Sequence, residues 1–242
     1  MIAAPDPSRP VPPGRVRVDC HVHTVESGDA VTTLDQLAER VAVHRIDVVC
    51  ITDHNHLAGT PERLSRAIGA RAVLGEEIRT RSGELIGLFL TERVPYVLPA
   101  REVVELIRAQ GGIVCAPHPY DPLRAGVGAD LDAMCDAGLI DAVEVFNAKI
   151  ADPEHNRAAV RTARAYGLPG TVGSDAHDPP GVGAAYLELP DFDGPGSFLD
   201  ALHEAEHRGE YRPHAPRYIP GPPAASRSGR DLGSRGHAPD SA

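Results

Sequence analysis

The sequence predicts an α/β fold, a parallel α/β barrel contained in a single domain. A unit made of a short apolar strand, a polar tip and a helix recurs about six or seven times along the chain. The strand predicted at 46–51 is almost continuously apolar, as in a parallel sheet covered by helices. No change of composition marks a second domain. In such barrels the carboxyl ends of the strands meet on one face, so the polar tips should converge there.

The individual elements follow from hydrophobic periodicity and from capping residues. Strands are predicted at 16–23, 46–51, 72–78, 85–90, 113–116, 142–146 and 170–173. Helices are predicted at 34–42, 61–70, 100–110, 131–137, 153–166 and 197–208. Thr32 or Thr33 can cap the first helix, Gly111 and Gly112 end the third, and the last helix closes the fold.

Both ends of the chain are expected to lie outside this domain. Residues 1–14 contain five prolines and almost no large apolar side chains, which predicts a disordered lead-in. From residue 213 to 242, Pro, Gly, Ser and Arg dominate, which predicts a disordered tail. The folded domain should therefore span residues 15–212.

The first predicted strand has two faces of opposite chemistry. Apolar and polar residues alternate over 16–23, so His21 and His23 should point the same way. Two histidines spaced in this way offer a pair of nitrogen donors to one cation. The alternative is a pair of half-buried histidines whose nitrogens are satisfied by hydrogen bonds.

Histidines and carboxylates also follow the other predicted strands. They are His21 and His23, Asp53 and His54, Glu77, His118, and Asp175 and His177, with Asp29 in the first loop. Separate polar residues at the starts of loops are the alternative, but five such tips favour a common cause, a multinuclear metal centre. Imidazole and carboxylate ligands without thiolate suit Zn, Mn or Fe. Closely spaced cations are a usual device for hydrolysing phosphate esters.

Composition limits the classes of partner. Acidic residues outnumber basic ones by 34 to 24, a net charge of −10, so a broad basic surface for duplex nucleic acid is not expected. A small phosphorylated substrate fits better. The four cysteines are not closely paired, which is typical of thiols in a reducing compartment. No apolar run reaches the roughly 18 residues of a membrane helix, so we expect a cytoplasmic protein without a membrane partner.

Taken together, the strand tips give the chain a family resemblance. It resembles the PHP-domain (polymerase and histidinol phosphatase) family, whose fold is a distorted seven-stranded (β/α) barrel. The resemblance covers about residues 16–190. It is carried by Asp19-Cys20-His21-Val22-His23-Thr24, Thr52-Asp53-His54, Gly75-Glu76-Glu77-Ile78, Pro117-His118-Pro119, Glu144-Val145-Phe146-Asn147 and Gly173-Ser174-Asp175-Ala176-His177.

The resemblance implies up to three metal sites. His21, His23, Glu77 and Asp175 would hold the first cation, Glu77 and His118 the second, and Asp29, His54 and His177 the third. Asp53 would orient a ligand rather than bind metal itself. This chain departs from the family pattern in two places. Glu84 stands where several relatives carry a histidine, which leaves the second site one ligand short, and Asp29 follows His23 by six residues instead of the commoner five.

A few other polar residues are candidates for catalysis. Arg124, held on a loop with three prolines, could clamp two phosphate oxygens, and Arg79 and Arg81 are placed to do the same. His56 could donate a proton, and Lys149 is a weaker candidate for phosphate binding. For each of them a solvated loop residue is the alternative.

The resemblance implies a metal-dependent phosphoesterase, most simply a phosphatase of small molecules or nucleotides. It would use two or three divalent cations (Mn, Zn or Fe), and hydroxide formed from metal-bound water would attack phosphorus. The alternatives are a phosphodiesterase or single-strand 5'-3' exonuclease, and a non-catalytic PHP scaffold module. Only forty residues separate Glu77 from His118, which leaves no room for the inserted helical subdomain of some nucleotide-cleaving relatives.

Overall fold

The computed structural model describes residues 2–212, and the tail expected at 213–242 lies outside the described residues. The strands are β1 (Arg15–Val22), β2 (Val48–Ile51), β3 (Arg71–Arg79), β4 (Glu84–Leu88), β5 (Ile113–Ala116), β6 (Ala142–Asn147), β7 (Gly170–Gly173), β8 (Ala185–Pro190) and β9 (Glu206–Gly209). The α-helices are α1 (Leu34–His44), α2 (Pro61–Ile68), α3 (Ala100–Ala109), α4 (Leu131–Asp136), α5 (Pro153–Tyr166) and α6 (Pro195–Leu202).

The strands form one curved sheet in the order β7-β6-β5-β4-β3-β2-β1-β8-β9. The loop after β7 returns to β1, where the Asp175 amide donates to the His21 carbonyl (2.7 Å) and the His23 amide donates to the Ala176 carbonyl (3.0 Å). Gly173 makes this approach possible, because a Cβ there would lie 2.3 Å from the Cβ of His21. The sheet is therefore a nearly closed barrel, and the predicted α/β barrel is confirmed.

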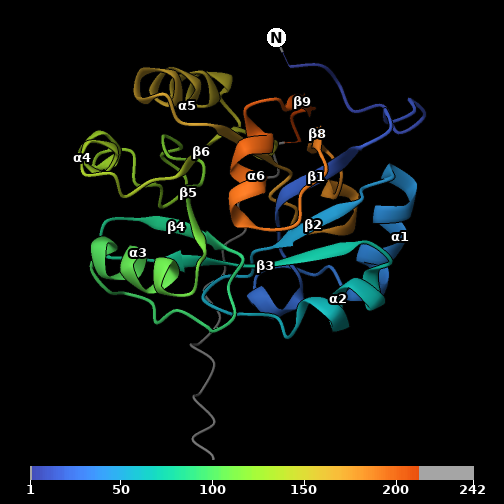
Figure 1. Cartoon of the computed structure of the whole chain (residues 1–242), viewed down its shortest axis with the longest axis horizontal. Helices are drawn as coiled ribbons and strands as arrows, with labels where there is room; N and C mark the ends of the chain where they lie inside the picture. The colour runs from blue at the N-terminus through green and yellow to red at the C-terminus, as the bar shows by residue number, and fades with distance from the viewer. Residues whose placement is uncertain (1, 213–242) are drawn as a thin grey trace, which may run out of the picture.

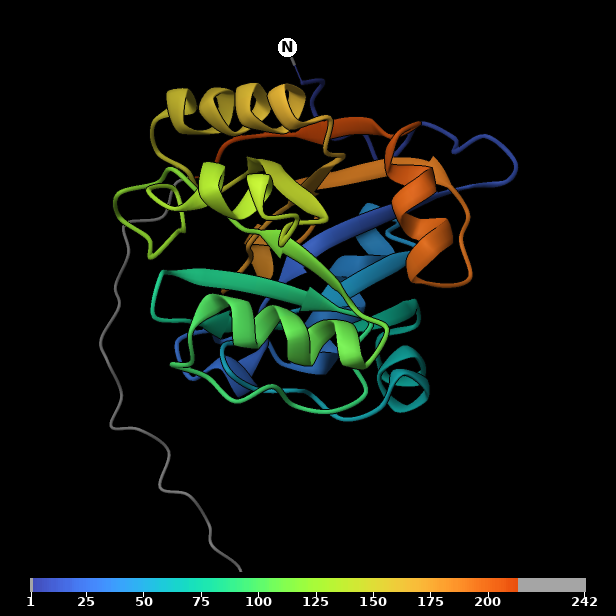
Figure 2. The same ribbon diagram turned by 60° about the vertical axis from the view of Figure 1, so that its left-hand side comes forward.

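The barrel is distorted because it is not parallel throughout. β4 runs antiparallel to both β3 and β5, and β8 runs antiparallel to both β1 and β9. One consequence is that β4 begins, rather than ends, at the face where the parallel strands have their carboxyl ends. Figure 1 shows α1 and α2 on one side of the curved sheet and α3, α4 and α5 on the other, while α6 lies in front of the strands at the centre of the view. In Figure 2 the side with α3, α4 and α5 is turned forward.

The helices begin where side chains satisfy their free amides. Thr33 and Gln36 form a reciprocal capping box at α1, and Thr60 caps α2, which starts with Pro61. Leu37 and Val41 of α1 are buried against β2. β2 is buried on both faces, as predicted, because Val48 and Cys50 belong to the main core while Val49 and Ile51 pack under α1 and α2.

β1 does not alternate as regularly as predicted. Its register against β2 shifts between Asp19 and Val22. Val18 and Cys20 belong to the main core, whereas Val22 joins the apolar cluster under α1 and α2. Such irregularities in strands often adjoin functional sites, where they redirect side chains.

The end of the fold differs from the prediction. The helix expected at 197–208 is shorter (α6, Pro195–Leu202), and the rest of that segment forms the edge strand β9. β9 pairs with β8, a strand at 185–190 that the periodicity did not predict. The reason is tertiary, because β8 needs a hydrogen-bonding partner on the side away from β1, and the polar segment 206–209 supplies it.

Residues 2–14 also differ from the expected disordered lead-in, because they lie against the barrel. Arg17 is fully buried, and its guanidinium donates to the Asp6 carbonyl (3.0 Å), the Arg9 carbonyl (2.7 Å) and Glu188 Oε1 (3.1 Å). A buried guanidinium needs several acceptors. The proline-rich segment provides them with its backbone, a function that its composition does not reveal.

Among residues 2–212, no helix combines the length and the apolar character needed to cross a membrane.

Candidate metal centre

The carboxyl ends of the parallel strands bring all eight predicted metal ligands to one face of the barrel. Seven of the eight form three groups, and within each group the potential ligand atoms lie within 4.8 Å of one another. The groups are His21, His23 and Asp175; His21, Glu77 and His118; and His23, His54 and His177. Asp29 adds to the last group, since its Oδ2 lies 3.4 Å from Nε2 of both His54 and His177. Residues separated by up to about 150 positions in the sequence thus meet at one site.

His21, in β1, and His23, which directly follows β1, are each held through Nδ1 by a neighbouring side chain. His21 Nδ1 lies 3.0 Å from Glu144 Oε1. His23 Nδ1 lies 2.8 Å from the Ser27 hydroxyl, which donates its own hydrogen to Asp53 Oδ1 (2.7 Å) and must therefore accept from the imidazole. Nε2 of His21 and Nε2 of His23 then lie 2.9 Å apart, and both are close to Glu77 Oε2, at 3.3 Å and 3.2 Å. Histidine ligands of metals are commonly oriented in this way.

Glu77 is at the centre of the ligand groups. Its Oε1 lies 2.9 Å from His118 Nε2, and its Oε2 lies 3.2 Å from both His23 Nε2 and His54 Nδ1. Burial alone would raise the pKa of Glu77, but His54 and His21 hold that pKa well below its ordinary value. The carboxylate is thus ionised, and its two oxygens face different histidines, Oε1 facing His118 and Oε2 facing His23 and His54.

The histidines do not all respond to the site in the same way. Burial lowers the pKa of His23 to about 4, helped by His177 and His54. Burial also opposes protonation of His54, yet the carboxylates of Glu77 and Asp29 raise its pKa to about 9. Without a cation, protons on the histidines thus balance part of the negative charge at the site.

Several features show that this donor set fits divalent cations. Asp175 Oδ1 and His118 Nδ1 are buried without a hydrogen-bond partner among the described residues. Asp175 (φ 51°) and His118 (φ 25°) also adopt left-handed backbone conformations, a strain that clusters at functional sites. A buried carboxylate surrounded by imidazole nitrogens is the donor set of Zn, Mn and Fe sites.

Comparison with known proteins places the chain in a family. The family model of the PHP domain matches residues 19–112, and that of the PHP-associated region matches residues 153–206. The uncharacterized protein MJ1587 of Methanocaldococcus jannaschii is 39% identical over 157 residues, which are 60% of this chain and 90% of that protein. The chain belongs to the PHP-domain family.

Two further proteins extend the comparison. The uncharacterized protein MJ0417 of the same organism is 36% identical over 197 residues, 77% of this chain and 79% of that protein. A two-domain protein from Bacteroides vulgatus, described as containing a predicted PHP-like metal-dependent phosphoesterase, superposes with a TM-score of 0.63 at 16% identity. That match covers 87% of this chain and 68% of the other, and shows that the two share the PHP fold.

Two positively charged side chains, Arg124 and Lys149, lie beside the predicted metal ligands of this PHP domain. Arg124 donates through Nη1 to Asp175 Oδ2, and only 16% of its side chain is exposed. Lys149 Nζ lies 2.9 Å from His177 Nδ1 and 3.7 Å from Asp175 Oδ1. Burial alone would raise the pKa of Asp175, but Arg124 and Lys149 hold that pKa well below its ordinary value. Two of the four predicted phosphate-binding candidates, Arg124 and Lys149, thus contact predicted metal ligands.

The other candidates for catalysis differ in whether they contact the predicted metal ligands. Asp53 is buried and accepts from the Thr24 amide (2.6 Å) and from Ser27, so it acts on His23 through Ser27. His56 is 44% exposed beside Glu26, and no described contact joins it to the ligands, so its catalytic role stays a prediction. Arg79 pairs with Glu84, and Arg81 donates to the Val97 carbonyl (3.2 Å).

Sequence reasoning missed two residues that position ligands. Glu144 accepts from the His118 amide (2.7 Å) and from Asn147 Nδ2 (3.0 Å), in addition to its contact with His21. Ser27 joins His23, Asp53 and the His54 amide. Glu144 lies in one of the motifs that carry the resemblance, so the sequence held a signal for it. Ser27 lies in a polar loop without such a signal.

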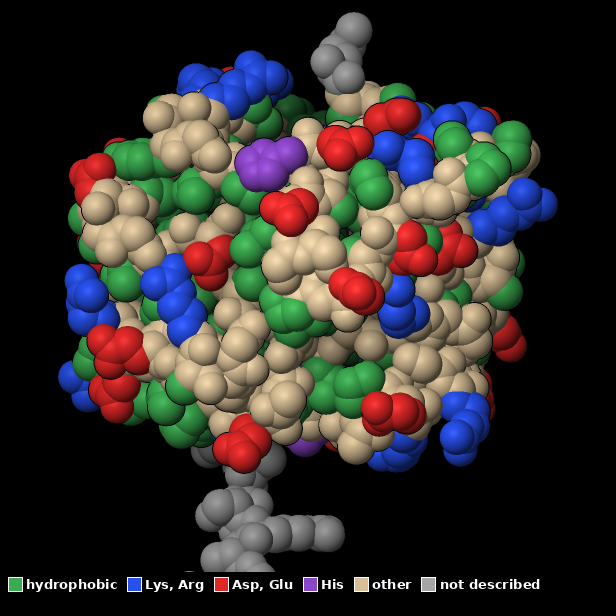
Figure 3. Space-filling view, viewed as in Figure 1, with side chains coloured by type: hydrophobic (Ala, Val, Ile, Leu, Met, Phe, Trp, Pro, Cys, Tyr) green, Lys and Arg blue, Asp and Glu red, His purple; other side chains and the backbone are tan. Residues whose placement is uncertain are grey.

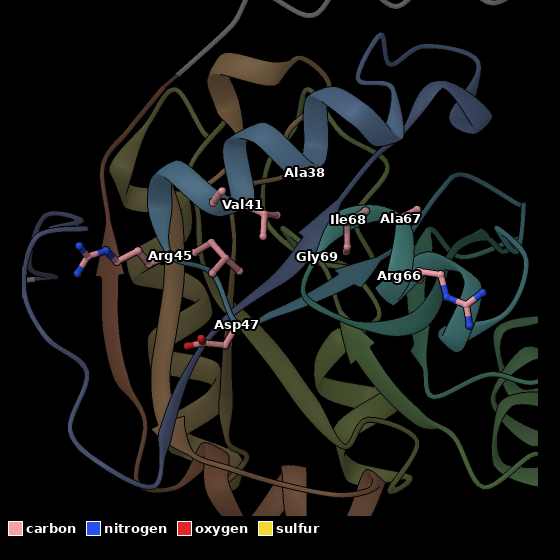
Figure 4. A pocket seen from close by; sticks show the side chains of 10 residues that line it. Ala38, Val41, Arg45, Asp47, Arg66, Ala67, Ile68 and Gly69 are labelled. Carbon is pink, nitrogen blue, oxygen red and sulfur yellow. The ribbon is translucent and has the colours of Figure 1, made fainter.

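A surface hollow at the opposite end of the barrel offers no such chemistry. Figure 4 shows this hollow, of about 450 Å³, between the last turns of α1 and α2 and lined among others by Val41, Arg45, Asp47 and Ile68. Asp47 precedes β2, so the hollow adjoins the amino end of that strand. Its lining includes no histidine or cysteine, and it does not compete with the metal centre as a site of catalysis.

Proposed function

We propose that this protein is a metal-dependent phosphatase that hydrolyses a small phosphomonoester. The observation that carries the proposal is the set of eight buried or half-buried histidines and carboxylates around Glu77, with Arg124 and Lys149 beside them. Bound divalent cations would supply an activated water and neutralise phosphate oxygens.

The protein's own groups have separate tasks in this proposal. His21 and His23, whose rings Glu144 and Ser27 already orient, would hold cations through Nε2, and Glu77 would hold them through its carboxylate. Arg124 and Lys149 both contact Asp175, which is itself a predicted ligand. If they are released from Asp175, the two side chains would bind the oxygens of an incoming phosphate. A guanidinium and an ammonium together suit the dianionic end of a monoester.

The surface favours a small substrate over duplex nucleic acid. On the face seen in Figure 3, Lys and Arg side chains are interspersed with Asp and Glu and form no continuous basic surface. The stretch between Glu77 and His118 is occupied by β4 and α3, which belong to the barrel itself. A long nucleic-acid footprint normally needs a positively charged track with stacking platforms.

The test is hydrolysis by protein of defined metal content. The chain is freed of metal with a chelator, reloaded separately with Mn, Zn or Fe, and assayed with p-nitrophenyl phosphate, bis(p-nitrophenyl) phosphate, nucleotides and a panel of phosphorylated metabolites. We expect monoesters to be cleaved, and cleavage to be lost together with bound metal in His21→Ala.

A matched control and clear outcomes accompany this test. His203→Ala removes an exposed histidine at the end of α6 and should change neither metal content nor activity. Faster cleavage of the diester would favour a phosphodiesterase instead. A fully metallated protein that cleaves none of these esters would contradict the proposal and favour a scaffold module.

A further inference from the structure

Glu84 lies at the metal centre because β4 runs antiparallel to β3. It is the first residue of β4 and pairs with Arg79, the last residue of β3. In a barrel with only parallel strands, the first residue of a strand would lie at the opposite end from the ligands. The reversed direction of β4 brings this residue to the ligand face instead.

The register of the two strands also turns Glu84 toward the ligands. Glu77 pairs with Ile86, and side chains of directly paired residues share one face of a sheet. Glu84 is two residues before Ile86 and therefore points to the same side as Glu77. In agreement with this register, ligand atoms of Glu77, Glu84 and His54 lie within 4.8 Å of one another. Only 14% of the Glu84 side chain is exposed.

The backbone holds this position firmly. The Glu84 amide donates to the Ala125 carbonyl (2.7 Å), and Glu84 forms an isolated bridge with Gly126. Gly83, just before it, has a φ of +129°, and a Cβ there would lie 2.7 Å from the Ala125 carbonyl oxygen. The loop that follows His118 thus fixes the start of β4. The backbone of Glu84 lies between this loop on one side and β3 on the other.

The contact with Arg79 does not account for this arrangement. Arg79 Nη1 lies 3.3 Å from Glu84 Oε1, but half of the Arg79 side chain is exposed, and such ion pairs contribute little to stability. Meanwhile two carboxylates, Glu77 and Glu84, lie close together in a mostly buried place. Like charges in this position repel, and a cation bound between them would relieve the repulsion.

We propose that Glu84 is a metal ligand which, together with Glu77, holds one of the divalent cations, with His54 within reach of the same position. The inference rests on the proposed metal centre. Because carboxylate oxygen suits harder cations than imidazole does, the site should favour Mn²⁺ over Zn²⁺ more than a histidine at the same position would.

The test compares four proteins: wild type, Glu84→Gln, Glu84→His and Arg79→Ala. Each is freed of metal and titrated with Mn²⁺ and with Zn²⁺ by calorimetry, and bound equivalents are counted by elemental analysis. We expect Glu84→Gln to lose one equivalent or to bind its weakest Mn²⁺ about 10- to 100-fold less tightly, a typical cost for damage around a metal site. Glu84→His should retain the equivalents with a relative preference shifted toward Zn²⁺. Arg79→Ala should bind like the wild type.

The outcomes separate this inference from the proposed function. Equal stoichiometry and affinity in Glu84→Gln and wild type would overturn the role of Glu84, even if the wild type hydrolyses phosphomonoesters. A wild type that binds no cation would overturn both proposals. If Glu84→Gln does not fold, Glu84→His decides, because Mn²⁺ and Zn²⁺ preferences identical to those of the wild type contradict a ligand at this position. Loss of metal from Arg79→Ala to the same extent as from Glu84→Gln would assign the effect to the ion pair instead.

Discussion

Replacing Arg124 by alanine tests how the site binds phosphate. In the structure the guanidinium donates to the buried Asp175, which is also 3.7 Å from Lys149. Without a bound cation, Arg124→Ala leaves a buried carboxylate with one positive partner fewer. Breaking a buried pair in this way costs about 3–5 kcal/mol of unfolding free energy, and the nearby Lys149 places the expected loss at the low end.

The effect on catalysis should be of a different kind. Cations bound at Asp175 replace the missing charge, so the metallated variant should recover most of its stability. Its metal affinity should equal or exceed that of the wild type, because Arg124 no longer competes for the carboxylate. Turnover of phosphomonoesters should nevertheless fall about 10- to 1,000-fold, on the scale of losing one donor that stabilises developing charge.

The assay combines three measurements on the same samples: thermal unfolding with and without Mn²⁺, metal content, and kcat and KM for p-nitrophenyl phosphate. Arg124→Lys should lie between the wild type and Arg124→Ala, since it keeps the charge but cannot bind two oxygens side by side. Arg101→Ala is the matched control, because Arg101 is an exposed arginine of α3 that is not among the candidates for phosphate binding. Normal kcat and KM in fully metallated Arg124→Ala would refute this reasoning and move attention to Lys149.

Three further predictions concern the support of the site. Ser27→Ala removes the acceptor that orients His23, and metal affinity measured by calorimetry should fall about 10- to 100-fold with the fold retained. Gly173→Ala places a Cβ 2.3 Å from that of His21, so both metal affinity and thermal stability should decrease, the latter by about 1–3 kcal/mol as for other overpacked positions. Burial raises the pKa of Glu76 from its ordinary value of 4.5 to about 7, so between these pH values the unfolded chain loses this proton while the native protein keeps it. Native stability should therefore decrease as pH rises from about 4.5 to 7, by at most about 3 kcal/mol from this group, and Glu76→Gln should abolish that decrease in urea unfolding curves.

The sequence by itself determined the class of fold and most of the residues that the structure brings together at the candidate metal centre. Short apolar strands ending in histidine or aspartate are local patterns, and their meeting at one face follows from parallel barrel geometry. His54 and His118 could therefore be assigned to one site without coordinates, although more than sixty residues separate them. The family resemblance added the grouping of ligands around Glu77.

Only the tertiary structure decided the features that depend on strand direction and on distant partners. Local periodicity does not tell whether β4 is parallel or antiparallel, yet this direction determines on which face Glu84 lies. The proline-rich residues 2–14 have few large apolar side chains, but their carbonyls satisfy the buried guanidinium of Arg17. β9 is polar and forms because β8 needs an edge partner. In each case the deciding interaction joins residues far apart in sequence, so the information lies in the folded backbone and not in any single segment.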